Sequence, residues 1–448
     1  MKRFAVVFSG ILLLFFLSST AMEACAQGSA SQRLELSGLI AEALQNNPDV
    51  IAARKRWESA RAVIRARRAL PDPEFSYTYY ADSVETRVGP IEQGFGLKQT
   101  FPFFGKRRLR GEMAVKEAEA LKESYEALKM EVIRQVKRAF YDLFYISTII
   151  DITHREKSLL KRFERTASAK YQTGKGLQQD ILKVHVETSK LMDRLLALNN
   201  QKQTAEARLN TLLNQPPDRP LGKPEQPELK DFPFQQQELF ELLRKHRQEL
   251  RAAKALIEES ERAYDLAKRE YFPDLTIGAN YLQVGKRTAD VEDNGKDALS
   301  IMVGINIPIW QRKLSSQAKS ALEMIQARSS QYRTTLNQTL FEVKDNYFRI
   351  QTARETMDLY ENVLIPQAEQ SMKSAEAGYI TGTVSFLDLL DAERILLQIQ
   401  FGYWQAYTDY LKRIADLERA VGIELAEYRP GKAGVTGGNN HGGEKKTR

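Results

Sequence analysis

An internal duplication limits what this chain can fold into more than any other feature of its sequence. At an offset of 200 residues, PDVIAARKRWESA (48–60) aligns with QELRAAKALIEES (248–260). The offset has grown to 208 at the motif Tyr-x-Thr-Gly-x5-Asp, which occurs at 171–180 and again at 379–388. Because the matches keep one order while the offset drifts only slightly, the chain contains two copies of one structural unit.

A proline-rich segment separates the two copies. NQPPDRPLGKPEQPELKDFPF (214–234) holds six prolines, and proline removes a backbone donor and disfavours helix in the residue before it. We therefore expect a linker at 214–234 between a first repeat over about 34–213 and a second over about 235–425. The Gly-rich, basic tail at 426–448 is expected to be disordered.

The N-terminus is typical of an exported protein. Lys2 and Arg3 precede an apolar run that ends near Leu17, and small residues follow. This layout predicts a signal peptide at 1–26, with a retained membrane anchor and lipidation of Cys25 as alternatives. Cys25 is the only cysteine, so the exported chain cannot be stabilised by intramolecular disulfides.

Each repeat is expected to contain, in this order, a helix, two strands, a very long helix, a glycine turn and a second long helix. The strands are expected at about 74–82, 93–103, 274–284 and 299–309, joined by polar loops near 83–92 and 286–297. Apolar and polar residues alternate along them, and their length is that of a tilted strand that crosses a bilayer.

The long helices form hairpins at about 108–213 and 314–425. Between Arg108 and Lys170 there is no proline, and Gly111 is the only glycine. Apolar or aromatic residues recur in steps of three or four at 121, 125, 128, 132, 136, 139, 143, 146 and 150. This spacing indicates a packed helical layer or coiled coil. Pro366 is expected to kink or break the second long helix.

Four strands cannot close a barrel, since about eight is the smallest number with a filled interior. Open strand edges are not tolerated in lipid, so the membrane interpretation requires several chains to pool their strands. The net charge of +8 comes from 66 basic and 58 acidic residues that are interspersed, which favours a solvated helix surface and no nucleic-acid partner.

These features together resemble the TolC family of outer-membrane efflux proteins: signal peptide, duplicated halves, Pro-rich joint and paired Tyr-x-Thr-Gly-x5-Asp motif.

The resemblance covers about 34–425. It implies a mainly α fold with a small membrane β-barrel part, in which a homotrimer shares twelve strands, four per chain, on a long α-helical barrel. It also implies an outer-membrane exit duct that extends into the periplasm. The partners would be outer-membrane lipid, a periplasmic adaptor and an inner-membrane pump, for which the RND type is favoured. A periplasmic coiled-coil adaptor or scaffold without a pore is the alternative.

The resemblance places a gate at the second turn. The family's Asp-x-x-Asp pattern is matched by DLLD, so Asp388 and Asp391 would ring a constriction of the tunnel and favour cations. The alternative is local, because Ser385 and Asp388 also fit Ser-x-x-Asp capping of a helix start.

The turns themselves are expected to dock the adaptor, and nearby residues to link neighbouring hairpins. The docking residues are Gly174, Lys175, Gly176, Gly382, Thr383 and Val384. The linking residues are Tyr171, Asp180 and Tyr379, with packing under the turn as the alternative for the tyrosines. The two turn glycines, Gly174 and Gly382, are expected to adopt positive φ. Val384 stands where some family members have a basic residue, which puts a salt bridge there in doubt.

No catalytic, cofactor or metal site is expected. The four histidines are scattered without supporting ligands, and no phosphate loop or nucleophile arrangement occurs. The stretches ALPDPEF (69–75) and FPFFGKRRLRGE (101–112) resemble the heavy-metal branch of the CusC/CzcC kind. Drugs, other small molecules and secreted proteins remain open as alternative cargo.

Overall fold

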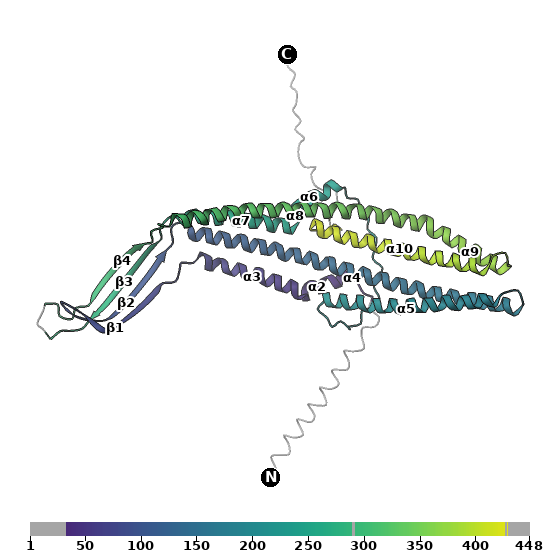
Figure 1. Ribbon diagram of the computed structural model, residues 1–448, viewed down its shortest axis with the longest axis horizontal. Helices are drawn as coiled ribbons and strands as arrows, with labels where there is room; N and C mark the ends of the chain where they lie inside the picture. Colours follow the sequence, from purple (N-terminus) through teal and green to yellow (C-terminus); the bar gives the residue numbers. More distant parts are fainter. Residues whose placement is uncertain (1–32, 289–291, 426–427, 429–448) are drawn as a thin grey trace, which may run out of the picture. The chain divides into compact units, whose positions relative to one another are not determined.

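The computed structural model describes residues 33–288, 292–425 and 428. The expected signal peptide, and the expected tail apart from Tyr428, lie outside the described residues. The first repeat contains α2 (Leu36–Asn46), α3 (Pro48–Arg68), β1 (Glu74–Thr86), β2 (Gly89–Phe101), α4 (Lys106–Gln172) and α5 (Gln178–Leu212). The second contains α6 (Gln236–His246), α7 (Gln248–Arg269), β3 (Leu275–Val284), β4 (Ala298–Ile305), α8 (Gln311–Leu359), η1 (Tyr360–Leu364), α9 (Ile365–Thr381) and α10 (Phe386–Val421). The two repeats thus follow the same order of elements (Figure 1).

The four strands form one antiparallel sheet in the order β1-β2-β3-β4, so β2 of the first repeat pairs with β3 of the second. The register places cross-strand neighbours in rows. One row consists of Phe75, Leu97, Ala279 and Ile301, and the next of Tyr77, Phe95, Tyr281 and Leu299. The opposite face carries the row Ser76, Gly96, Asn280 and Ser300. Because side chains alternate across a strand, the sheet has one apolar face and one face of small and polar residues.

On the polar face, side chains of the neighbouring strands closely surround Gly96. A Cβ on Gly96 would lie 2.4 Å from Ser76 Oγ and 2.8 Å from Asn280 Oδ1. The neighbouring strands therefore fill the space above Gly96, and their polar side chains cover this part of the face.

The outer edges of the sheet are open. β1 pairs only with β2, and β4 only with β3, among the residues that the structure describes. Each edge strand consequently offers backbone N–H and C=O groups to a further strand.

The first two strands are longer than the sequence indicated. The prediction of a polar loop near 83–92 is therefore wrong. Val84 pairs with Ile91 and Thr86 with Gly89 beyond a register shift in β1, which leaves a turn of only two residues between the strands. Thr86 Oγ1 donates to the carbonyl of Gly89 at 2.6 Å, and Gly89 has a φ of 140°. The polar side chains of this stretch are tolerated because its side chains are exposed.

The last strand is shorter than the expected 299–309, because β4 ends at Ile305. Pro308 has no N–H to continue the ladder. The side chain of Asn306 instead accepts a hydrogen bond from the backbone of Asp274. Ile307 and Ile309 lie beyond the strand and stay exposed.

The chain divides into two compact units. One unit comprises residues 51–128 and 246–339 and holds the sheet with its flanking helical segments. Inside it, Lys106 at the start of α4 is 1% exposed and forms ion pairs with Glu270 at 3.0 Å and Asp274 at 2.9 Å. Asp274 also accepts the backbone N–H of Phe103 at 2.7 Å. This cluster around the buried Lys106 connects the end of β2 to the start of β3.

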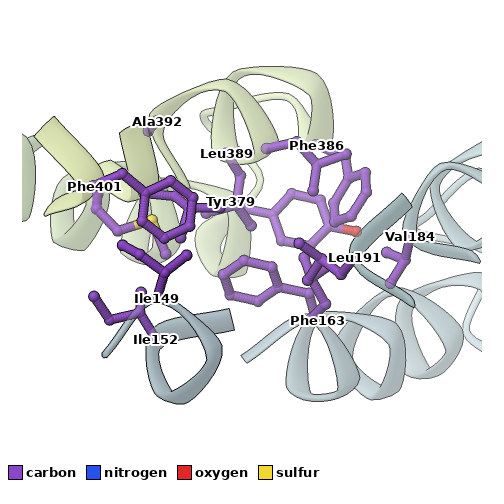
Figure 2. Packing of buried hydrophobic residues seen from close by; sticks show 14 of the residues in the cluster. Ile149, Ile152, Phe163, Val184, Leu191, Tyr379, Phe386, Leu389, Ala392 and Phe401 are labelled. Carbon is purple, nitrogen blue, oxygen red and sulfur yellow. The ribbon is translucent and has the colours of Figure 1, made fainter. Parts of the chain in front are cut away.

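The other unit comprises the described residues up to 50, 129–245 and from 340 onward. Of the expected helical seam, Val132, Val136, Ala139 and Leu143 are buried, as predicted. Further along, α4, α5, α9 and α10 share one apolar core (Figure 2). In the described part of the chain, no helix has both the length and the apolarity needed to cross a membrane.

Pro366 interrupts the second long helix as predicted, through a π-helical turn. Its nitrogen cannot donate to the carbonyl four residues earlier, and its ring crowds that carbonyl. The chain responds with η1, one π-helical turn between α8 and α9, and both flanking residues keep right-handed helical dihedrals.

Candidate functional site

The second tip is the turn between α9 and α10. α9 ends at Thr381, and Gly382 follows with φ 88°, in the left-handed region that the sequence required of it. The backbone N–H groups of Gly382 and Thr383 both donate to the carbonyl of Gly378 at 2.9 Å. Gly382 and Thr383 are exposed, and Val384 is partly buried.

A capping box starts the next helix at this tip. The backbone N–H of Asp388 donates to Ser385 Oγ at 3.2 Å, and Asp388 Oδ2 accepts from the Ser385 hydroxyl at 2.7 Å and from its backbone N–H at 3.3 Å. Asp391 lies one helical turn further along α10, and both carboxylates are exposed. The capping role anticipated for Asp388 is present, and it leaves the carboxylate in contact with solvent.

The first tip, between α4 and α5, is built differently. Gly174 has φ 71° and donates to the carbonyl of Tyr171 at 3.0 Å, while the N–H of Lys175 donates to the carbonyl of Lys170 at 2.9 Å. Leu177 occupies the N-cap position of α5 and provides no side-chain cap. The duplicated turn therefore keeps its glycine in both copies, but only the second copy has a capping box.

The structure brings Tyr379 and Asp180 together across the two hairpins. The Tyr379 hydroxyl lies 3.5 Å from Asp180 Oδ2, and its ring packs on Phe386 with centroids 5.1 Å apart. Tyr379 lies in the shared core of both hairpins (Figure 2). Burial, and then the nearby Asp180 carboxylate, raise the pKa of Tyr379 to about 12. Tyr171, the counterpart in the first repeat, is instead 48% exposed.

Two cations that the sequence interpretation missed also join the hairpins. Lys170 of α4 donates to the carbonyl of Tyr379, and its Nζ lies 4.4 Å from the centre of the tyrosine ring. Arg394 of α10 forms an ion pair with Glu187 of α5, with Nε 3.4 Å from Oε2. Each residue lies close in sequence to a predicted site residue, Lys170 beside Tyr171 and Arg394 three positions after Asp391. This closeness in sequence is the signal from which Lys170 and Arg394 could have been predicted.

Within the described residues, no group of three or more His, Cys, Asp or Glu side chains is arranged to hold a metal ion.

A sheet with one apolar face and open edges, in a chain that also has long helical hairpins with polar tips, is typical of a channel-forming outer-membrane protein. Residues 39–215 and 239–423 match the family model of the outer membrane efflux protein. The cobalt-zinc-cadmium resistance protein CzcC of Cupriavidus metallidurans is 24% identical over 412 residues, which cover 88% of this chain and 91% of CzcC. The outer membrane protein TolC of Vibrio cholerae is 20% identical over 403 residues, 86% of this chain and 90% of TolC.

The fold is also that of solved channels. The crystal structure of the outer membrane protein VceC of Vibrio cholerae superposes with a TM-score of 0.72 at 22% identity, covering 86% of this chain and 96% of VceC. The chain belongs to the outer membrane efflux protein family. It is an outer-membrane exit duct of efflux pumps that reaches into the periplasm, and the alternative of an adaptor without a pore is wrong.

Proposed function

We propose that three copies of this chain close their sheets into one barrel and conduct efflux substrates through a tunnel that their helices continue. The open four-stranded sheet carries this proposal, because neither of its edges can remain unpaired in lipid. Three copies pool four strands each into twelve, enough for a wide barrel. The apolar rows would then face lipid, and the row of Ser76, Gly96, Asn280 and Ser300 would face the lumen.

The second tip is the proposed gate. Threefold symmetry would bring together six carboxylates, Asp388 and Asp391 from each chain. Exposure of both side chains in the single chain supports this, since neither is buried in the hairpin core. A ring of this kind favours cations and repels anions at the narrow end of the tunnel. The contact of Tyr379 with Asp180 would hold the two hairpins of each chain in register at the same depth.

The tips are also the proposed docking sites for a periplasmic adaptor, which links the duct to an inner-membrane pump of the RND type. The tip residues Gly174, Lys175, Gly382 and Thr383 are exposed, with Gly176 and Val384 partly buried between them. Exposed backbone at these glycines gives a partner helix close access to both turns.

For cargo we propose heavy-metal cations. The support is the alignment with a cobalt-zinc-cadmium resistance protein along nearly its whole length, together with the acidic tip. Loss of the gene should then lower tolerance to zinc, cobalt or cadmium more than tolerance to drugs. The reverse order would assign the duct to drugs instead.

The duct itself is tested by reconstituting the purified chain in planar lipid bilayers. We expect three copies per particle by native mass spectrometry, and cation-selective steps of conductance. A detergent-free monomer that gives no conductance would refute the proposal.

A further inference from the structure

Two glutamates occupy core positions on facing helices near the second tip. Glu156 of α4 lies four residues from both Ile152 and Leu160, and Glu393 of α10 lies four residues from both Leu389 and Leu397. These four apolar neighbours belong to the single buried cluster in which Figure 2 shows Ile152 and Leu389. Glu393 itself is only 4% exposed, and Glu156 is partly buried. Each carboxyl group is therefore part of a helix face that is otherwise apolar and packed.

The carboxyl group of Glu156 lies close enough to that of Glu393 to raise the pKa of Glu393. Glu156 Oε1 is buried, and among the described residues no ordinary donor forms a hydrogen bond to it. Two carboxyl oxygens can form a hydrogen bond only when one of them carries a proton. Burial, and for Glu393 also the facing Glu156, raise the pKa of both groups.

The charged neighbours on the other helices are already engaged. On α5, burial acts to raise the pKa of Glu187, but hydrogen bonds from Arg394 and Lys190 hold it below its ordinary value. Arg394 thus lies next to Glu393 in α10 while its guanidinium binds Glu187. On α9, Glu376 lies 3.7 Å from Arg162 of α4. These cations are bound to other carboxylates, so a proton is the remaining group that can form a hydrogen bond between Glu156 and Glu393.

We propose that Glu156 and Glu393 share one proton and that this shared proton latches α10 to α4 just behind Asp391. When the proton leaves, two buried negative charges face each other, and separation of the helices is the way to rehydrate them. The second tip then loosens as the pH rises. The effect on conductance rests on the proposed gate, whereas the latch itself does not.

The direction of the pH dependence follows from the raised pKa values. A carboxyl group whose pKa is higher in the packed state than its ordinary 4.5 stabilises that state at acid pH. This contribution is lost as the pH rises from the ordinary value through the raised one. The latch is therefore closed in acid and released in alkali.

Hydrogen exchange on the assembled wild-type protein tests the latch directly. After correction for intrinsic exchange, protection of residues 386–401 should fall about tenfold or more between about pH 6 and about pH 9, the change expected for one pKa unit of linkage. Residues 48–60 of α3 serve as the internal reference. Unchanged protection of 386–401 would overturn the proposal.

Glu393→Gln and Glu156→Gln supply the matched variants, since an amide keeps the shape and donates permanently to the remaining carboxylate. Each should flatten the pH dependence of exchange, while the exposed Glu369→Gln should keep it. Conductance of the same proteins should rise with pH in wild type and stay flat in Glu393→Gln. If exchange responds and conductance does not, the latch stands and the gate assignment fails. If both variants keep the wild-type pH response, the shared proton is refuted.

Discussion

Ser385 and Asp388 cap each other at the start of α10, with the Asp388 N–H donating to Ser385 Oγ at 3.2 Å and the Asp388 carboxylate accepting the Ser385 hydroxyl at 2.7 Å. The carboxylate proposed to ring the tunnel is thus also the group that fixes the first turn of its helix. The cap therefore leaves the proposed gate role of Asp388 open, as the sequence interpretation allowed when it weighed capping alone against pore lining with or without capping.

Loss of the cap should loosen the tip. Ser385→Ala removes the acceptor for the Asp388 N–H and should destabilise the start of α10 by about 1 kcal/mol. Faster hydrogen exchange of residues 386–390 would show this. Ser385→Thr keeps the hydroxyl and should exchange almost as slowly as wild type; equal exchange in Ser385→Ala would show that the box contributes nothing.

The acidic ring should govern block by multivalent cations. Asp388→Asn combined with Asp391→Asn removes the charges but leaves an oxygen for the cap, so the assembly should persist. We expect block to weaken by about tenfold, or ~1.4 kcal/mol spread over the charges of three chains. Bilayer recordings measure it, with the exposed Asp193→Asn of α5 as control. Unaltered block would locate the constriction elsewhere.

The two faces of β4 should respond differently to charge. Ile301 is 78% exposed on the apolar face, and its neighbour Ser300 lies on the polar face. Ile301→Lys should destabilise the membrane part by about 2–4 kcal/mol if the residue lies near the bilayer centre. Ser300→Lys should be tolerated and alter conductance. Heat-modifiable migration on gels compares the two, and equal tolerance would argue against a lipid-facing row.

Lys106 should matter far more than the exposed cations near it. Lys106→Met leaves Glu270 and Asp274 without their buried cation, but their side chains are 32% and 20% exposed, so water can partly solvate them and we expect a cost of about 1–3 kcal/mol. Arg108, whose side chain is 72% exposed, provides the control Arg108→Met with little expected effect. Thermal unfolding of the detergent-solubilised proteins would distinguish them. Equal unfolding midpoints for Lys106→Met and Arg108→Met would mean that water solvates Glu270 and Asp274 as well as the lysine does.

Gly382 should be constrained by its backbone alone. Its φ is +88°, and no atom lies within 4 Å of the place where a Cβ would be built. Gly382→Ala should thus cost about 1–2 kcal/mol from the left-handed conformation only. Gly382→Asn should cost less, because asparagine tolerates this region. Equal thermal unfolding midpoints for Gly382→Ala and the wild-type protein would contradict this prediction.

The periodic features of the chain were predictable from sequence, and the exceptions to periodicity were not. The seam at Val132, Val136 and Ala139 and the turn at Gly382 follow from local spacing and backbone chemistry. The strand extension through Val84 was missed because polar residues on an exposed strand are typical of a loop. The pairing of Glu156 with Glu393 was missed because a charge on an apolar stripe looks like an interruption. Only the facing helix, distant in sequence, explains it.

The open edges of the sheet also have a genetic consequence. In the threefold assembly proposed above, β1 of each copy must meet β4 of another, so no copy completes its own wall. A mutant protein whose helices fold normally, but in which β1 or β4 can no longer pair, would enter mixed assemblies and inactivate them. At equal expression, roughly one assembly in eight would contain wild-type copies only. An allele that encodes such a protein should behave as dominant, whereas an allele that abolishes synthesis should be recessive.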